Sequence, residues 1–86
     1  MAQDTRGERI KKRRLEMQMT QVELAKRARL NKTTVYRYER DYIDASATSL
    51  LAIARVLELS VEFILTGQGG SPRQRRARRV AEQRAS

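Results

Sequence analysis

The sequence predicts a small all-α protein of five short helices, and three observations support this fold class. The 86-residue chain holds one proline, Pro72, and none of its four glycines lies between residues 8 and 66. The same stretch shows neither alternating β-branched residues nor an Asn-Gly hairpin signal, so strands are not expected. Polar residues with helix-capping spacing recur along it instead. Caps rather than breakers therefore divide one domain into helices.

The first helix is expected to begin after Thr5 and to run to about Met17. Thr5 and Glu8 have the spacing of a capping box, in which an N-cap Thr and an N3 Glu satisfy free backbone N–H groups. The residues on its expected inward side are Ile10, Arg14 and Met17, with Leu15 nearby.

The second helix is expected to begin after Thr20, because Thr20 and Glu23 repeat the capping-box spacing. Met19 and Leu24 then occupy the two hydrophobic-staple positions that flank this cap. The apolar stripe of this helix consists of Leu24, Ala25 and Ala28.

Three further polar residues mark the remaining helix starts. Asn31, Ser46 and Ser60 are the expected N-caps of the third, fourth and fifth helices, and Gly67 is expected to end the last one. The residues spaced for burial are Val35 and Tyr38 on the third helix, Leu50, Ile53, Ala54 and Leu57 on the fourth, and Val61, Phe63, Ile64 and Leu65 on the fifth.

The charge is distributed unevenly along the chain, whose formal net charge is +9. Residues 1–40 hold 12 basic and 5 acidic groups, whereas residues 41–70 hold a single basic group and 4 acidic ones. Residues 71–86 hold 6 arginines and 1 glutamate. This asymmetry favours one surface that faces a polyanion, with nucleic acid ahead of a membrane surface or a merely solubilising charge.

The composition excludes several chemistries. Without His or Cys the chain has no disulfide scaffold, thiol nucleophile, zinc finger or Ser-His-Asp triad. No acidic pair, metal-ligand set or phosphate-binding loop stands out, so neither an enzyme nor a metal or cofactor is expected. No apolar stretch approaches the length of a membrane span, and no secretory signal opens the chain, so a cytoplasmic location is expected.

The second and third helices have the spacing of a helix-turn-helix unit. Only a three-residue break at residues 28–30 separates them. Ala25 is small at the point where two steeply crossing helices would nearly touch, and Val35 lies where the third helix would pack back.

Several separate groups of residues match one known pattern. They are Thr20-Gln21-Val22-Glu23-Leu24-Ala25-Lys26-Arg27-Ala28, Leu30-Asn31-Lys32-Thr33-Thr34-Val35, Glu39, Ser46, Leu50, Ile53, Ala54, Leu57, Ser60 and Phe63-Ile64-Leu65. Over residues 6–67 the sequence thus resembles the lambda-repressor-like, Cro/repressor (XRE-type) helix-turn-helix family. The resemblance implies a five-helix bundle whose third helix enters the major groove of B-DNA.

The sequence departs from that family's pattern at three turns. Arg29, Asp41 and Glu58 stand at or near positions where the family usually carries glycine. Each position is expected to adopt a left-handed backbone, which costs a residue other than glycine roughly 1 kcal/mol. Asp tolerates that conformation best. The departures are expected to lower stability rather than change the fold.

The resemblance places base recognition on the third helix. Its outward residues Lys32, Thr33 and Arg37 occupy the base-reading positions of similar domains, and Tyr36 lies beside them. The chemistry is suitable, because Lys and Arg donate to guanine O6 and N7 while Thr can donate, accept or contact the thymine methyl group.

Contacts to the DNA backbone are expected around this helix. Similar domains use a Gln at the start of the second helix to bind a phosphate and brace the third, and Gln21 stands there. A helix N-terminus adds free N–H groups that suit an anion. The other expected phosphate contacts are Asn31, Arg40, Lys11 and Lys12.

Arg14 and Glu39 are expected to be structural. The family commonly places an Arg at the end of the first helix against this Glu, and a bidentate pair would tie the first helix to the third.

A homodimer is expected, because operators read by such domains are usually palindromic. The proposed dimer surface is the fifth helix and the end of the fourth, and its large apolar groups are Val61, Phe63, Ile64 and Leu65. One helical face can bury only some of these four side chains in its own domain, so the remainder is expected to form an exposed patch.

Two regions are predicted, residues 1–67 as the DNA-binding domain and residues 68–86 as a flexible linker with an Arg-rich tail. The tail could contact the DNA backbone, RNA, an acidic protein or nothing. Its arginines are Arg73, Arg75, Arg76, Arg78, Arg79 and Arg84.

The leading functional hypothesis is a sequence-specific transcriptional regulator, of repressor or controller type, that binds double-stranded DNA. The alternative is an antitoxin-like or coregulator module whose basic tail binds a protein partner. A third possibility is an RNA-binding or nucleoid-type protein without sequence preference, which a competition titration against random duplex and RNA would distinguish.

Overall fold

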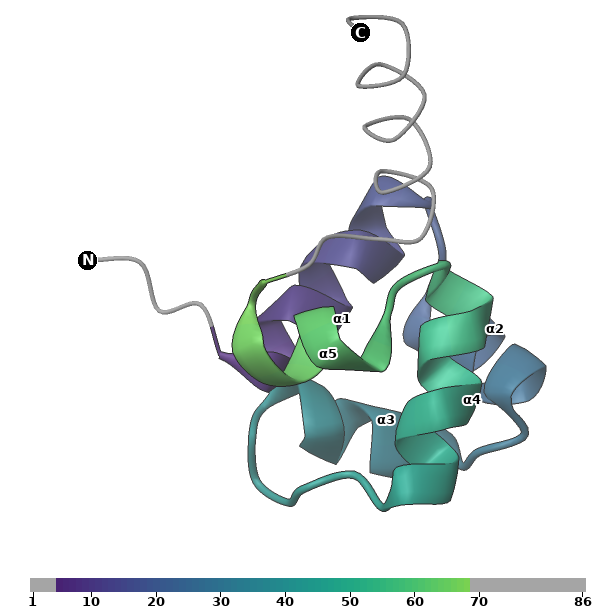
Figure 1. Cartoon of the computed structure of the whole chain (residues 1–86). Coiled ribbons are helices and arrows are strands. Elements are labelled where there is room, and N and C mark those ends of the chain that lie inside the picture. The colour runs from purple at the N-terminus through teal and green to yellow at the C-terminus, as the bar shows by residue number, and fades with distance from the viewer. Residues whose placement is uncertain (1–4, 69–86) are drawn as a thin grey trace, which may run out of the picture.

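The computed structural model describes residues 5–68 and confirms the all-α class with five helices (Figure 1). Their bounds are α1 Arg6–Glu16, α2 Gln21–Ala28, α3 Lys32–Glu39, α4 Ala47–Leu57 and α5 Val61–Thr66. Apart from Gln68, the predicted linker and Arg-rich tail lie outside the described residues. No helix within residues 5–68 is long and apolar enough to cross a membrane.

All five predicted N-caps are confirmed. The cap side chains each accept a backbone N–H from the first turn, and they belong to Thr5, Thr20, Asn31, Ser46 and Ser60. At α2 the capping box is complete, since the Glu23 side chain also accepts the Thr20 N–H at 3.0 Å. That hydrogen bond lowers the pKa of Glu23, so the contribution of the box is present at neutral pH and is lost as acid protonates the carboxylate.

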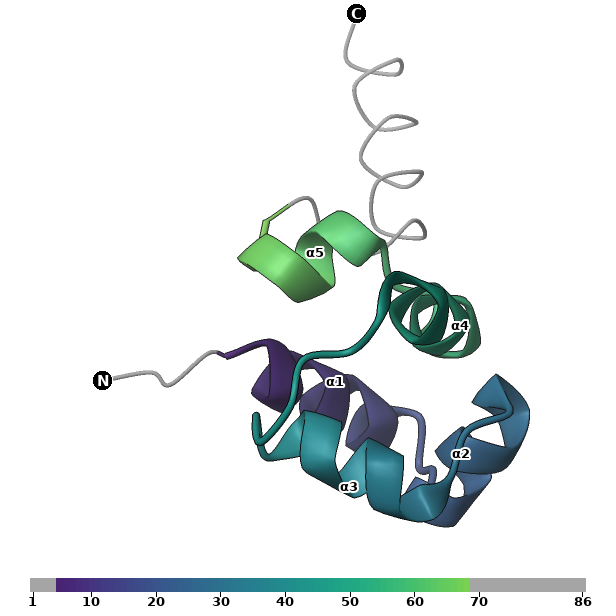
Figure 2. The same cartoon turned by 90° about the horizontal axis from the view of Figure 1, so that it is seen from below.

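The helices form two groups with the core between them. Figure 2 shows α1, α2 and α3 together on one side and α4 and α5 on the other. α1 packs against α3, α4 and α5, while α2 packs against α3 and α4. The largest completely buried side chains come from both groups and are Leu24, Val35, Ile53, Leu57 and Ile64. In this arrangement α3 lies on the outside of the first group, with α1 between it and α5.

The left-handed backbone expected at three turns is confirmed. Arg29, Asp41 and Glu58 have φ values of 58°, 59° and 56°. Gln18, between α1 and α2, adopts the same conformation with φ 57° and was not predicted. Asp41 offsets its strain, because its carboxylate accepts the Gly7 N–H at 2.9 Å and also the Thr5 hydroxyl. The end of α3 thereby caps the start of α1.

Gly7 allows α1 and α3 to approach each other closely. A Cβ atom placed on Gly7 would lie 2.4 Å from the Tyr38 carbonyl oxygen and 2.5 Å from that of Glu39. Both obstacles are backbone atoms, so no side-chain rotation relieves the clash. The two helices can keep this spacing only with glycine at residue 7.

We therefore expect Gly7→Ala to lower the free energy of unfolding by about 1–3 kcal/mol, as overpacked sites do, despite the better helix propensity of alanine. Urea denaturation measures the change. Lys12→Ala on the exposed side of the same helix is the control and should stay within about 0.5 kcal/mol of the native protein. A Gly7→Ala protein as stable as the native chain would contradict the close approach.

Two arginines of α1 join this helix to the second group. Arg9 Nε donates to the Ile64 carbonyl at 2.9 Å, and Arg13 Nε donates to the Leu57 carbonyl at 2.8 Å. Carbonyl groups in the last turn of a helix lack partners within the helix, so these guanidinium groups satisfy the ends of α5 and α4. Sequence patterns gave no sign of this role, because the carbonyls lie 55 and 44 residues away.

Candidate nucleic-acid interface

One side of α3 is buried and the other is exposed. Val35 and Tyr38 face the core as predicted, whereas all four predicted base-contacting side chains are exposed to solvent. These are Lys32, Thr33, Tyr36 and Arg37. Because α3 lies on the outside of its group (Figure 2), the described helices leave this side uncovered.

The exposed residues of α3 and its C-cap Arg40 follow two rows with a spacing of four residues. Lys32, Tyr36 and Arg40 form one row, and Thr33 and Arg37 form the other, because residues four apart are neighbours on a helix. Each row combines cationic donors with a hydroxyl group. Such donors match the acceptors on guanine, adenine and thymine edges in a major groove.

The row through Tyr36 continues into a contact that sequence reasoning missed. Tyr42, which follows α3, lies edge-on to Tyr36 with ring centroids 6.2 Å apart and planes at 75°. The Arg40 guanidinium lies 5.2 Å from the Tyr36 ring centroid, and its Nε donates to the Tyr36 hydroxyl at 3.3 Å. This hydrogen bond raises the pKa of Arg40, which remains cationic. An aromatic residue three positions after the end of α3 was the only signal in the sequence.

Of the expected phosphate-binding residues, three gather at one groove. An open groove of about 450 Å³ between α1 and α3 is lined by Lys11, Gln21 and Arg40, together with Tyr36 and three acidic residues. The acidic residues are Glu8, Glu39 and Asp41. Lys12 is not among the lining residues; it lies about 200° around α1 from the buried Ile10 and is exposed.

Gln21 and Asn31 already have partners within the protein. The Gln21 Nε2 donates to Glu39 Oε1 at 3.1 Å, which braces α2 against α3. The Asn31 Oδ1 accepts the Thr33 N–H at 2.8 Å as the N-cap of α3. Both side chains therefore help to position the helix that carries the exposed donors.

The structure brings Arg14 and Glu39 together in a buried ion pair. Arg14 Nε lies 2.7 Å from Glu39 Oε2, and Nη2 lies 3.0 Å from Oε1, so the pair is bidentate. Their side chains are only 8% and 2% exposed. A third donor, Arg14 Nη1, reaches the Met19 carbonyl at 2.8 Å. The network connects α1, the turn after it and α3.

The structure corrects the predicted dimer surface at one of its four residues. Ile64 is completely buried inside the domain, so it cannot face a second chain. The reason is that α5 packs on α1 and α4 with Ile64 in the middle of that contact. Val61, Phe63 and Leu65 are half-buried and pack against the edge of the core. The exposed part of the predicted patch is therefore limited to these three side chains.

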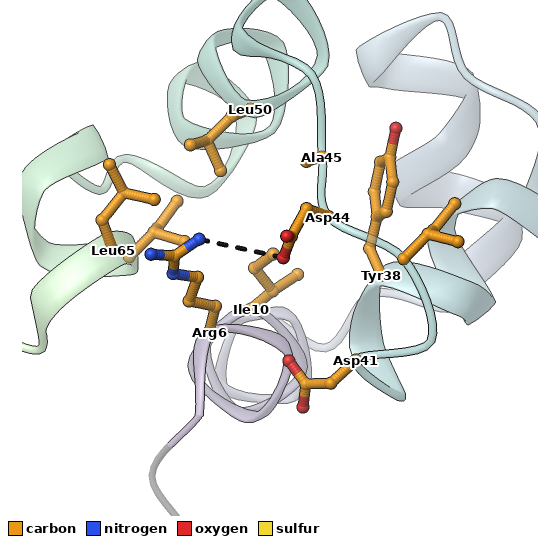
Figure 3. Close-up of a pocket in the computed structure, with 10 residues that line it drawn as sticks. Arg6, Ile10, Tyr38, Asp41, Asp44, Ala45, Leu50 and Leu65 are labelled. Atoms are coloured by element: carbon orange, nitrogen blue, oxygen red, sulfur yellow. Dashed lines mark ion pairs between the residues drawn. The ribbon is translucent and has the colours of Figure 1, made fainter.

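A small cleft lies beside this region, next to the segment between α3 and α4. Arg6 at the start of α1 points toward Asp44, and the two charged groups lie 3.8 Å apart (Figure 3). The cleft of about 20 Å³ below them is lined mainly by apolar side chains. That volume admits about one water molecule, so the cleft is too small for an organic ligand.

Three comparisons place this chain beside known regulators. The helix-turn-helix family model matches residues 10–64. The immunity repressor protein of Bacillus phage phi105 is 39% identical over 61 residues, which are 71% of this chain and 42% of that repressor. The chain thus spans less than half the length of this curated relative.

Solved structures with the same fold include two DNA complexes. The P22 c2 repressor bound to a synthetic operator matches with a TM-score of 0.73 and 28% identity, covering 74% of this chain and 97% of that one. The master regulator for biofilm formation SinR, in complex with DNA, matches with a TM-score of 0.67 and 31% identity, covering 70% of this chain and 97% of that one. The complex of SinR with the SinI protein matches with a TM-score of 0.70 and 28% identity, covering 88% of this chain and 77% of that one.

Proposed function

The chain belongs to the XRE/Cro–C1 type of helix-turn-helix family, and we propose that it is a sequence-specific transcriptional regulator of repressor or controller type. It contains a repressor-like DNA-binding domain, and the family is one of DNA-binding proteins rather than enzymes. The finer proposal is that it binds a palindromic operator in double-stranded DNA as a homodimer. A cytoplasmic location would accompany this function.

The observation that carries the proposal is the exposed donor surface of α3 on a rigid support. The buried Arg14–Glu39 pair and the Gln21 side chain hold α3 from behind. A site held by buried hydrogen bonds keeps its donors in a fixed geometry, which base recognition requires. The complexes of the P22 c2 repressor and SinR with DNA support the same use of this fold.

We assign base contacts to four residues and phosphate contacts to five. The base-contacting set is Lys32, Thr33, Tyr36 and Arg37. The phosphate-contacting set is Gln21, Asn31, Arg40, Lys11 and Lys12. Phosphate contacts fix the register of the protein on the duplex, while base contacts supply its sequence preference. Lys11 and Arg40 are exposed cations beside α3, and this position suits a contact to a phosphate group.

The homodimer is proposed to use the half-buried side chains of α5. Val61, Phe63 and Leu65 are the three apolar groups of that helix with remaining exposure, and α3 lies away from α5 across α1. Two copies joined through α5 would leave both α3 helices free for DNA. A single small module reaches specific affinity with difficulty, so the second copy also adds needed contacts.

Selection of bound duplexes from a random pool at a stated salt concentration tests this function. We expect an enriched inverted repeat whose half-sites lie about one helical turn apart, roughly 10 base pairs, because a two-fold dimer presents two α3 helices. Sedimentation at tens of micromolar is the companion measurement and should show a species larger than the 10.0 kDa chain. A pool without any enriched sequence would refute sequence-specific binding.

A second candidate function is an antitoxin-like or coregulator module with a protein partner. The SinR–SinI complex favours it, since a protein with this fold binds another protein there. The Arg-rich tail, which lies outside the described residues, is the proposed partner-binding segment. Co-purification of one defined protein from the native host, lost on deletion of residues 71–86, would support this alternative.

A further inference from the structure

The most exposed large apolar side chain of the described residues lies next to the DNA-binding helix. Tyr42 is 64% exposed, so its ring gains little from burial and adds little to the stability of the core. Its main chain is nevertheless held against α3, because its backbone N–H donates to the Arg37 carbonyl at 3.0 Å. The ring meets Tyr36 in the edge-to-face arrangement that aromatic pairs prefer.

Arg40 makes a second contact with Tyr36. Its guanidinium lies over the Tyr36 ring within the range of a cation–π contact, and its Nε donates to the phenol oxygen. Tyr36 is therefore restrained by Tyr42 at its ring and by Arg40 at its face and hydroxyl. Since the phenol oxygen already accepts a hydrogen bond from a cation, the hydroxyl proton is left to donate.

We propose that Tyr42 is a positioning residue for DNA recognition, which holds Tyr36 so that its hydroxyl donates to an acceptor on a base edge. The acceptors of suitable chemistry in a major groove are guanine O6 or N7, adenine N7 and thymine O4. The inference rests on the proposed function and adds to it a residue that does not itself touch DNA. Without Tyr42, the Tyr36 side chain regains rotamer freedom, and ordering it again upon binding costs free energy.

The chain offers a matched control in the next residue. Ile43 is also an exposed apolar residue of the segment before α4, with 44% exposure, but it lines the cleft with Arg6 and Asp44 rather than the Tyr36 ring. Ile43→Ala therefore removes apolar surface from the same segment and leaves the aromatic pair intact. Tyr42→Phe keeps the ring edge that contacts Tyr36 and serves as the conservative rescue.

The experiment measures dissociation constants of the full chain for the preferred duplex and for each single-base-pair variant of it. We expect Tyr42→Ala to reduce discrimination about threefold to tenfold at one base pair, the scale of one hydrogen bond. Tyr36→Phe should lose discrimination at that same base pair. The double variant Tyr36→Phe with Tyr42→Ala should discriminate no less well than Tyr36→Phe alone. Tyr42→Phe and Ile43→Ala should discriminate like the native protein.

A second readout uses the free protein. The Arg40 Nε–H resonance in an NMR spectrum reports the contact with Tyr36, and we expect Tyr42→Ala to shift it while Ile43→Ala leaves it in place. An unshifted resonance would overturn the proposal. So would an equal loss of affinity for every duplex, or additive losses in the double variant.

The same measurements distinguish an incorrect role for Tyr42 from an incorrect proposed function. A native protein that prefers no duplex refutes sequence-specific binding before any substitution is compared, and the role of Tyr42 fails with it. A native protein that discriminates, beside a Tyr42→Ala variant that discriminates equally well, overturns the role of Tyr42 alone.

Discussion

Changing Lys32, Thr33 and Arg37 together to alanine is expected to reduce the preference for the selected duplex over random DNA by about a thousandfold. Each good side-chain contact to a base is worth roughly 1–3 kcal/mol of discrimination, and three of them account for about 4 kcal/mol. Binding to random DNA should persist in weaker form, because other cations still meet the phosphates. Titrations of both duplexes at several salt concentrations measure the two effects.

The fold should survive this triple change. All three side chains are exposed, and the helix cap at Asn31 bonds the Thr33 backbone rather than its side chain. Arg55→Ala combined with Thr48→Ala is a suitable control, since both residues are exposed on α4 in the other group of helices. The control should discriminate normally. If the triple variant still recognised the selected duplex as well as the native chain does, the assignment of α3 would be refuted.

Glu39→Ala is expected to lower the free energy of unfolding by about 3–5 kcal/mol, because it leaves a buried guanidinium without its counter-ion. The substitution removes both hydrogen bonds from Arg14 and the one from Gln21. A domain of this size is stable by only about 5–15 kcal/mol in total, so this loss approaches the whole margin. Thermal and urea denaturation at neutral pH measure it.

Two matched variants distinguish the cost of leaving a buried charge unpaired from the cost of losing an ion pair in general. Glu16→Ala breaks the partly exposed pair with Arg13, whose groups lie 3.5 Å apart, and should cost no more than about 1 kcal/mol. The double variant Arg14→Met with Glu39→Leu replaces the buried pair by apolar groups and should recover most of the stability. A Glu39→Ala protein that melts with the native chain would contradict the buried pair.

The candidate site was predictable from sequence in its outline. The alternation of buried Val35 and Tyr38 with exposed Lys32, Thr33, Tyr36 and Arg37 follows from the 3.6-residue period of a helix. The separation of Lys11 from Lys12 was not predicted, because only the packing of α1 on α3 decides which of two adjacent residues adjoins the groove. The contact of Tyr42 with Tyr36 was not predicted, because it depends on how the chain turns after α3.

The sequence by itself determined where the helices begin and which side of α2, α3 and α4 is buried. Thr5, Thr20, Asn31, Ser46 and Ser60 bond N–H groups two or three residues away, so the information for each cap is contained in a few adjacent positions. The left-handed turns at Arg29 and Glu58 were expected from the family resemblance, because neither residue type by itself favours that conformation.

Only the tertiary structure decided how these elements meet. Gly7 is required by two carbonyl groups more than 30 residues away, and Arg9 serves a carbonyl of α5. Ile64 is buried because α5 settles on α1 and α4, although its own helix could have turned another side inward. The contacts of Gly7 and Arg9 join distant parts of the chain through backbone carbonyl groups, so the amino-acid pattern carries no mark of them.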